Sequence, residues 1–202
     1  MDDAEPALAA AKDELRRSVR RRRVERGEPE RERLAERLRD VVLAAPVLDG
    51  ARTVACYAAL PHEPGTGPLR AALAAAGVRV LLPVVSGAVG APLDWAADQG
   101  VLRPAALGIG EPSGDRLGAD AVAAADVILV PALLVDTLGR RLGQGGGYYD
   151  ATLAALGRHP PVVALVHDDE LVDAAAMPVP AGPGDVRVDA VATPARWWDV
   201  PA

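Results

Sequence analysis

From residue 52 to the C-terminus, short apolar runs alternate with stretches that have the pattern of helices. The apolar runs cover residues 53–60, 78–85, 127–130, 162–166 and 186–193. The helix-like stretches cover residues 68–76, 119–125 and 147–156. Strands that alternate with helices form a largely parallel sheet covered by helices. We therefore predict an α/β fold with a largely parallel central sheet flanked by helices, and expect ligands at the carboxyl ends of its strands.

The first 45 residues follow a different pattern. Between residues 7 and 45, apolar side chains recur at three- and four-residue steps, which is typical of amphipathic helices. These side chains are Leu8, Leu15 and Val19 in the first half, and Leu34, Leu38, Val41 and Val42 in the second. Gly27 and Pro29 interrupt the pattern, so we predict an N-terminal helical pair. The 202 residues then form a single domain, in which residues 1–45 are a helical arm packed on the α/β core.

The charge of the chain indicates whether it could bind nucleic acid. The net charge of −6 argues against a nucleic-acid binder that depends on a broad basic face. Four consecutive arginines at residues 20–23 could form an RNA-binding arm or a solvated face of a helix. Residues 1–40 hold 12 basic and 11 acidic side chains, which neutralise one another locally. We therefore interpret the arginine run as a solvated helix face and expect no nucleic-acid partner.

Cysteine content and hydropathy bear on the location of the protein. Cys56 is the single cysteine, so no intramolecular disulfide can form, and a reducing compartment fits. Because Cys56 lies in an apolar run, we interpret it as a buried structural thiol. The N-terminus starts acidic and lacks the pattern of a signal peptide, and no uncharged apolar stretch reaches the roughly 18–20 residues that a bilayer requires. We expect a cytoplasmic protein with no membrane association.

A glycine-rich segment, residues 140–150 with the sequence RRLGQGGGYYD, joins a strand-like run to a predicted helix. Its four glycines let backbone N–H groups approach a phosphate, and the start of the helix favours an anion. Arg140 and Arg141 add cationic donors, and Asp150 adds a carboxylate for a metal ion. The glycines alone would equally suit a flexible loop. The combination at a strand-to-helix junction favours a phosphate-binding site.

The spacing of this segment excludes two common nucleotide-binding motifs. No Gly-Lys-Ser/Thr follows the glycines, so the segment is no Walker A loop. The glycines have the spacing G-x-G-G-G, and no acidic residue ends a second strand about 20 residues on, so a dinucleotide fingerprint is also excluded.

Residues 136–150, DTLGRRLGQGGGYYD, closely resemble the signature D-x-x-G-x-R-L-G-R-G-x-G-Y-Y-D of the 5-formyltetrahydrofolate cyclo-ligase family. Weaker resemblances follow the family's order along nearly the whole chain. They are Lys-x-x-Leu-Arg at residues 12–16, an acidic residue near a threonine at Glu63 and Thr66, Gly-x-x-Glu-Pro at residues 108–112, and D-x-x-V-D-x-V-x-T at residues 185–193.

The resemblance implies the cyclisation of 5-formyltetrahydrofolate to 5,10-methenyltetrahydrofolate, with ATP converted to ADP and phosphate and with Mg²⁺ as cofactor. Phosphorylation of the formyl oxygen would activate it, and N10 of the folate would then close the ring. Such chemistry requires positioning and charge neutralisation rather than a protein nucleophile. We expect a monomer whose partners are 5-formyltetrahydrofolate and ATP. The alternative is a non-catalytic nucleotide- or folate-binding module of the same fold.

The resemblance also implies roles for individual residues. Those implied for ATP are Lys12, Asp13, Glu14, Leu15, Arg16, Arg141, Leu142, Gly143, Gln144, Gly145, Gly146, Gly147, Tyr148 and Tyr149. Those implied for the folate are Arg16, Ala58, Glu63, Gln144, Gly145, Gly146, Gly147 and Tyr148. Lys12, Arg141 and Tyr149 would be catalytic, and Asp150 and Asp185 would hold Mg²⁺. Lys12 is the single lysine of the chain, and its ammonium provides a compact charge for phosphate oxygens.

Several of these residues have simpler alternatives. Asp150 could stabilise the first turn of a helix, Asp185 could be a turn residue, and Glu63 could be a solvated carboxylate in a loop. Trp95 could approach the folate, as its region does in relatives, or fill the core.

Two of the departures from the family pattern change the charge at their positions. Gln144 replaces a frequent arginine, which removes a cation near the phosphates. Glu170 replaces a frequent glutamine, which would place a negative charge near the folate.

Overall fold

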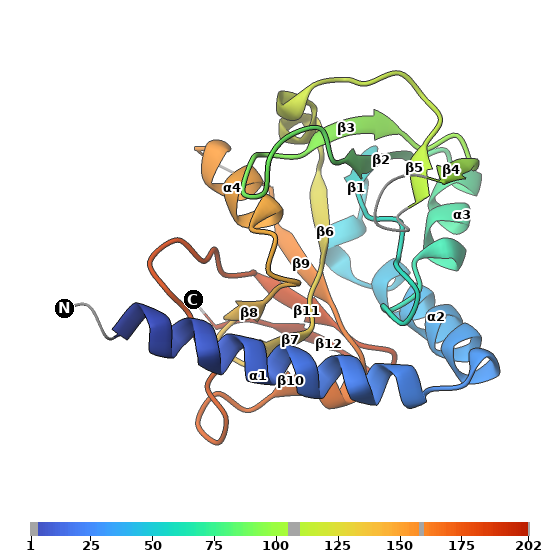
Figure 1. Cartoon of the computed structure of the whole chain (residues 1–202). Coiled ribbons are helices and arrows are strands. Elements are labelled where there is room, and N and C mark those ends of the chain that lie inside the picture. Colours follow the sequence, from blue (N-terminus) through green and yellow to red (C-terminus); the bar gives the residue numbers. More distant parts are fainter. Residues whose placement is uncertain (1–3, 105–109, 158–159, 202) are drawn as a thin grey trace.

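The computed structural model describes residues 4–104, 110–157 and 160–201 (Figure 1). Its α-helices are α1 (Ala4–Glu25), α2 (Glu28–Leu43), α3 (Gly67–Ala75) and α4 (Tyr148–Ala155). The 3-10 helices are η1 (Pro46–Leu48), η3 (Ala119–Ala124) and η4 (Asp168–Glu170). The strands are β1 (Thr53–Ala55), β2 (Arg79–Val84), β3 (Asp94–Ala97), β4 (Leu102–Pro104), β5 (Gly110–Pro112), β6 (Val127–Pro131), β7 (Leu134–Asp136), β8 (Arg141–Leu142), β9 (Val162–Leu165), β10 (Leu171–Val172), β11 (Ala190–Ala192) and β12 (Trp197–Asp199). Of the Gly-x-x-Glu-Pro motif at residues 108–112, Gly108 lies outside the described residues.

The central sheet has the strand order β12-β11-β9-β6-β1-β2-β3. The inner neighbours from β11 to β2 pair in parallel, while the edge strands β3 and β12 pair antiparallel. This arrangement confirms the predicted α/β fold with a largely parallel sheet. It also brings the carboxyl ends of β1, β2 and β6 to the same edge of the sheet, because parallel strands end on the same side.

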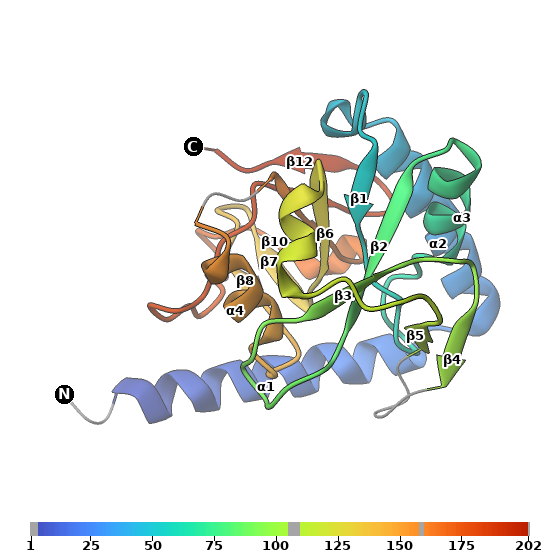
Figure 2. The same ribbon diagram turned by 90° about the horizontal axis from the view of Figure 1, so that it is seen from above.

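Helices cover both faces of this sheet (Figure 2). Along β6, Val127 and Leu129 face the cluster that contains residues of α2 and α3, whereas Ile128 and Val130 face the cluster that contains residues of η3 and α4. Such alternation follows from the two-residue period of a strand. The prediction of a central sheet flanked by helices is therefore confirmed.

Helix α1 lies across the small sheet β10-β7-β8 (Figure 1). Val19 packs with Leu133, Leu134 and Leu142 in a third hydrophobic cluster. Together with α2, α1 forms the predicted N-terminal helical pair.

The end of α1 corrects the interpretation of the arginine run at residues 20–23. Arg23 is 2% exposed, and its Nε and Nη2 donate to the carboxylate of Glu170, both at 2.8 Å. Its Nη2 also donates to the carbonyl of Ala132 at 2.6 Å. The run is therefore not a uniformly solvated face, because its last arginine turns inward to a carboxylate that is remote in the sequence.

The first apolar run leaves the sheet sooner than its sequence predicts. Residues 53–60 were expected as one strand, but β1 ends at Ala55. Beyond it the chain remains buried as a loop, because the Thr66 hydroxyl donates to the carbonyl of Tyr57 at 2.6 Å and the Tyr57 hydroxyl donates to that of Pro64 at 3.0 Å. Cys56 is fully buried there, and burial raises the pKa of its thiol to about 12, as expected of a structural cysteine.

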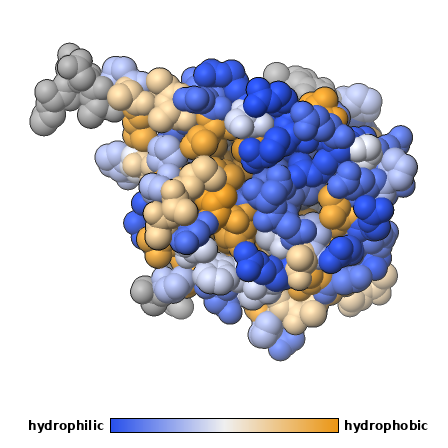
Figure 3. Space-filling model, turned by 90° about the horizontal axis from the view of Figure 1, so that it is seen from below, coloured by the Kyte–Doolittle hydropathy of each residue, from blue (hydrophilic) through white to orange (hydrophobic). Residues whose placement is uncertain are grey.

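Hydrophilic residues cover much of the molecular face seen from below, where apolar residues gather in smaller areas (Figure 3). None of the helices in the described ranges combines the length and the hydropathy that a membrane crossing requires.

Candidate active site

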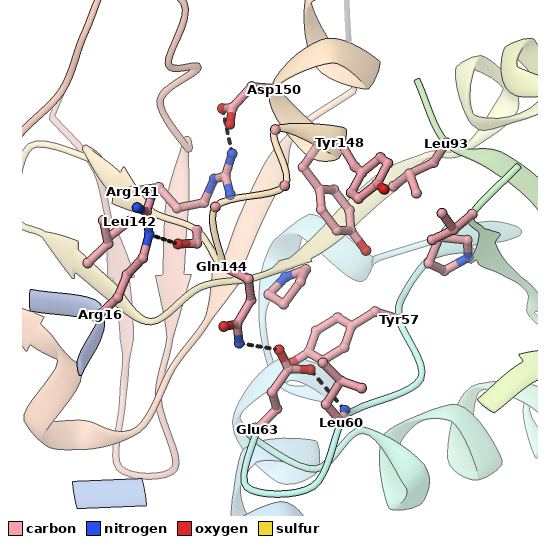
Figure 4. Close-up of a pocket in the computed structure, with 18 of the residues that line it drawn as sticks. Arg16, Tyr57, Leu60, Glu63, Leu93, Arg141, Leu142, Gln144, Tyr148 and Asp150 are labelled. Atoms are coloured by element: carbon pink, nitrogen blue, oxygen red, sulfur yellow. Dashed lines mark hydrogen bonds and ion pairs between the residues drawn. The ribbon is translucent and has the colours of Figure 1, made fainter. Parts of the chain in front are cut away.

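A cavity of about 440 Å³ opens at the carboxyl ends of β1, β2 and β6. The glycine-rich loop and the start of α4 form one wall, and the loop after β1 forms another (Figure 4). This is the edge of the sheet at which the sequence predicts ligand binding. The cavity therefore defines the candidate active site.

The cavity brings together most of the residues that the sequence predicts for ATP, folate and metal. They are Lys12, Arg16, Ala58, Glu63, Arg141, Leu142, Gly143, Gln144, Gly145, Gly146, Gly147, Tyr148, Tyr149, Asp150 and Asp185. Asp13, Glu14 and Leu15 lie on other faces of α1, because residues four apart share a helix face and their neighbours do not. Leu15 packs against the third hydrophobic cluster, and Asp13 accepts a hydrogen bond from Arg16 at 2.6 Å.

Helix α1 delivers two cations to one end of the cavity. The Lys12 ammonium lies 2.5 Å from Oδ2 of Asp185. One turn later, Arg16 Nε donates to the carbonyl of Gly143 at 3.0 Å. Both side chains are partly exposed, at 16% for Lys12 and 17% for Arg16. They can therefore reach an anion in the cavity without a rearrangement of the helix.

The glycine-rich loop adopts conformations that other residues rarely take. Gly145 has a φ of 104°, and Gly147, which precedes α4, has a φ of 67°. A side chain at Gly146 would meet the ring of Tyr148 at 2.8 Å. The loop therefore needs glycines to pass between the start of α4 and the cavity.

Arg141 lies under this loop and is paired with Asp150. The Arg141 side chain is 3% exposed, and its Nη2 donates to Oδ1 of Asp150 at 2.6 Å. Oδ1 of Asp150 also accepts the backbone N–H of Val186 at 3.2 Å. Asp150 thus reaches from the first turn of α4 to the loop that carries Asp185, which goes beyond stabilising its own helix.

The two aspartates have the chemistry that a magnesium ion requires. Within the described residues, Asp150 Oδ2 and Asp185 Oδ1 accept no hydrogen bond, and both side chains retain exposure, at 26% and 22%. Burial opposes ionisation of Asp185, but hydrogen bonds from Lys12 and the N–H of Gly182 lower its pKa. The described part of the chain holds no group of three metal-binding side chains. Mg²⁺ is commonly held by one or two carboxylates together with substrate phosphates and water, so this donor set fits that ion.

Glu63 lies at the opposite end of the cavity. Its Oε2 accepts the N–H of Leu60 at 2.9 Å, and its Oε1 accepts Nε2 of Gln144 at 2.9 Å (Figure 4). Glu63 is 7% exposed, so the alternative of a solvated loop carboxylate is wrong. Its carboxylate is instead oriented by two hydrogen bonds and lines the cavity.

The cavity wall also contains residues that the sequence pattern does not single out. They are Tyr57, Leu60, Pro83, Val85, Leu93 and Pro131. Pro83 and Pro131 belong to β2 and β6, and Tyr57 and Val85 lie just beyond β1 and β2. The rule that ligands bind at the carboxyl ends of parallel strands could have identified these four. They give the cavity a largely apolar wall.

Tyr149 lines the cavity and carries a buried hydroxyl. Burial raises the pKa of this phenol well above its ordinary value, with smaller contributions from Cys56 and Glu63. The hydroxyl is buried without a hydrogen-bond partner in the described residues. It therefore remains protonated at neutral pH and can donate to a bound ligand. Trp95, by contrast, is fully buried in the core on β3, as its simpler interpretation predicts.

Comparison with known proteins identifies the family. The sequence profile of the 5-formyltetrahydrofolate cyclo-ligase family matches residues 8–194. The chain belongs to this family. It is thus an enzyme of the cyclo-ligase family, as the glycine-rich signature predicts.

Individual relatives are similar over most of their length. The 5-formyltetrahydrofolate cyclo-ligase of Mycolicibacterium smegmatis is 40% identical over 190 residues, which cover 92% of this chain and 95% of the relative. The Escherichia coli K12 cyclo-ligase is 30% identical over 184 residues, or 90% of this chain and 99% of the relative. The NMR structure of Aquifex aeolicus 5,10-methenyltetrahydrofolate synthetase has a TM-score of 0.77 at 27% identity, covering 95% of this chain and 93% of that one.

Glu170, which replaces a frequent glutamine of the cyclo-ligase family, does not lie where the sequence predicts. It is fully buried, it pairs with Arg23, and it does not line the described cavity. The expectation that it places a negative charge near the folate is therefore wrong, because the guanidinium neutralises it inside the protein.

Proposed function

We propose that the chain catalyses the ATP- and Mg²⁺-dependent cyclisation of 5-formyltetrahydrofolate to 5,10-methenyltetrahydrofolate. One observation carries the proposal: a single cavity holds cations, carboxylates and a glycine-rich loop at one end, and an oriented carboxylate with apolar walls at the other. The first end suits a triphosphate and the second suits a pterin. Since α1 and the core both supply cavity residues, we also propose that the chain works as one cyclo-ligase domain.

At the phosphate end, we assign ATP binding to Lys12, Arg16, Arg141 and the N–H groups of residues 143–147. Ammonium, guanidinium and backbone N–H groups all donate to phosphate oxygens. Asp150 and Asp185 would hold Mg²⁺, which would neutralise charge on the phosphates when bound. Arg141 would reach the phosphates while it keeps Asp150 oriented.

At the folate end, we assign Glu63 to the polar edge of the pterin. Its carboxylate would accept hydrogen bonds from the pterin N–H groups, as an oriented acceptor does. Ala58, Gln144, Gly145, Gly146, Gly147 and Tyr148 would complete this region together with Arg16. Tyr148 and Tyr149 would lie where nucleotide and folate meet.

The proposed reaction proceeds in two steps. The formyl oxygen attacks the γ-phosphorus of ATP, so that an O–P bond forms and ADP leaves. N10 of the folate then attacks the formyl carbon and loses its proton, and phosphate departs with the former formyl oxygen. Lys12 and Arg141 would stabilise the charge that develops on the transferred phosphoryl group, and the Tyr149 hydroxyl would orient the substrate as a hydrogen-bond donor.

The proposal is tested by the absorbance of 5,10-methenyltetrahydrofolate formed from purified protein, 5-formyltetrahydrofolate, Mg²⁺ and ATP. Product should form with ATP and not when ATP is omitted. The competing function is a non-catalytic nucleotide- or folate-binding module, which Gln144 suggests because it replaces a cation. Folded protein that binds ATP and releases no ADP in response to the folate would support that module instead.

A further inference from the structure

Arg20 holds the glycine-rich loop from outside the cavity. Its Nη2 donates to the backbone carbonyl of Gln144 at 2.9 Å. Its Nη2 and Nε also donate to the side-chain Oε1 of Gln144, at 2.9 Å and 3.2 Å. One guanidinium therefore fixes both the backbone and the side chain of a single loop residue.

Arg16 and Arg20 act on consecutive carbonyls of this loop. Arg16 donates to the carbonyl of Gly143, and Arg20 donates to that of Gln144. Residues four apart lie on the same face of a helix, so α1 presents both guanidinium groups in one direction. The loop is thus fixed to helix α1 at two successive peptide units, directly before Gly145 to Gly147.

The contact with Arg20 also decides where the Gln144 amide points. Because Arg20 occupies Oε1, the Nε2 of Gln144 is directed to Oε1 of Glu63, 2.9 Å away (Figure 4). The other oxygen of Glu63 accepts from the N–H of Leu60. A continuous chain of hydrogen bonds therefore connects Arg20, which is exposed, to Glu63, which is 7% exposed.

We propose that Arg20 is a positioning residue of the active site, which acts through Gln144 to fix the glycine-rich loop and to orient the Glu63 carboxylate for the folate. Arg20 itself does not line the cavity, so its effect on the substrate passes through these two side chains. Its guanidinium also places a positive charge next to Gln144. The inference deepens the proposed function and rests on it for the identity of the ligand that Glu63 receives.

The first test needs no substrate. Amide hydrogen exchange in residues 143–147 should become roughly three- to tenfold faster in Arg20→Ala, because exposed hydrogen bonds contribute modestly to local stability. Arg21→Ala is the matched control, since Arg21 is the next residue of the same helix, is exposed, and makes no ion pair within the described residues. Exchange that is as slow in Arg20→Ala as in the control would overturn the loop-fixing part of the proposal.

The second test separates the two substrates by steady-state kinetics. Arg20→Ala should raise the KM for 5-formyltetrahydrofolate by roughly three- to tenfold, with a change in kcat of less than about twofold. Arg20→Lys should recover part of this loss, because an ammonium keeps the charge without the planar fork. An unchanged folate KM, or an equal loss in Arg21→Ala, would overturn the orienting role.

A double-mutant cycle shows whether the effect passes through Gln144. If it does, Arg20→Ala should change the folate KM much less in a Gln144→Ala background than in the wild type. Equal effects in both backgrounds would contradict the proposed connection. A wild-type enzyme that forms no ATP-dependent product would contradict the proposed function alone, since the exchange experiment tests the Arg20 contact without any substrate.

Discussion

Helix α1 brings cations to two regions of the molecule that differ in their exposure. In the first half of the helix, Lys12 pairs with Asp185 at the cavity, and the two side chains retain 16% and 22% exposure. Three turns later, the Arg23 and Glu170 side chains pair with 3% and 0% exposure. The same kind of ion pair is therefore open to a ligand at the cavity and closed to solvent at the end of the helix. For these two pairs on α1, exposure rather than residue type distinguishes the pair that can act on a substrate from the pair that anchors the helix.

This comparison predicts opposite effects in the two regions. Substitutions at the partly exposed Lys12–Asp185 pair should lower turnover and leave the free energy of unfolding nearly unchanged. Substitutions at the Arg23–Glu170 pair should lower the free energy of unfolding, because a buried charge without its partner is costly.

The largest effect is expected at the buried pair. Arg23→Ala removes the nearer of the two cationic partners of Glu170, leaving only Arg26 at 3.7 Å, and should lower the free energy of unfolding by about 3–5 kcal/mol. Urea denaturation followed by circular dichroism measures this change. In the paired replacement Arg23→Met with Glu170→Leu, much of the loss should be recovered, because neither charge is then left unpaired. A loss below about 1 kcal/mol in Arg23→Ala would mean that the pair does not anchor α1.

The next effect is expected at the cavity, in Asp150→Asn. The amide keeps an oxygen that can accept from Arg141, but it removes the negative charge that would hold Mg²⁺. We expect kcat/KM to fall roughly 100- to 1000-fold, in the range found when a stabilising group is removed from a transition state. Turnover measured against Mg²⁺ concentration tests the role of the charge. A wild-type Mg²⁺ dependence in the variant would remove Asp150 from the metal site.

A third prediction concerns pH and the buried region. Burial lowers the pKa of His167 to about 4, and the charges of Glu170, Arg26, Arg23 and Asp169 modify this shift. The imidazole is thus neutral in the folded protein at a pH where the unfolded chain already binds a proton, at about 6.5. The free energy of unfolding should therefore fall as the pH is lowered from about 6.5 to about 4, by up to roughly 3 kcal/mol.

His167→Gln isolates this contribution from that of the other titrating groups. The variant cannot be protonated in this range, so the difference in unfolding free energy between wild type and variant should change with pH and level off above about pH 7. Parallel pH profiles for the two proteins would show that His167 does not titrate as described.

The sequence predicts the five parallel strands of the central sheet, β1, β2, β6, β9 and β11, because each lies in an apolar run and these runs alternate with helix-like stretches. It does not predict β3, β4, β5, β7, β8, β10 and β12, which are two to four residues long. Such short strands depend on pairing with distant partners, as between Leu134 of β7 and Leu142 of β8. Local composition carries little information about pairing of this kind.

The sequence likewise predicts some of the cavity residues and misses the contacts that connect them. The glycine-rich signature gave residues 141–150, and the spacing of residues 12 and 16 is that of one helix face. The connection of Arg20 through Gln144 to Glu63 joins three segments that are remote in the sequence. The arginine run was misinterpreted at Arg23 for the same reason, because Glu170 lies 147 residues away.

The smallest effect is expected for Arg22, which is next to Arg23 but differs in exposure. Its Nε lies 3.3 Å from Asp169, and the two side chains are 40% and 47% exposed. Water and salt screen such a pair, so Arg22→Ala should change the free energy of unfolding by less than about 1 kcal/mol. The same urea denaturation that is applied to Arg23→Ala measures it, at low and at high salt. A loss as large as that of Arg23→Ala would contradict the role given to exposure, since two neighbouring arginines would then contribute equally despite their different exposure.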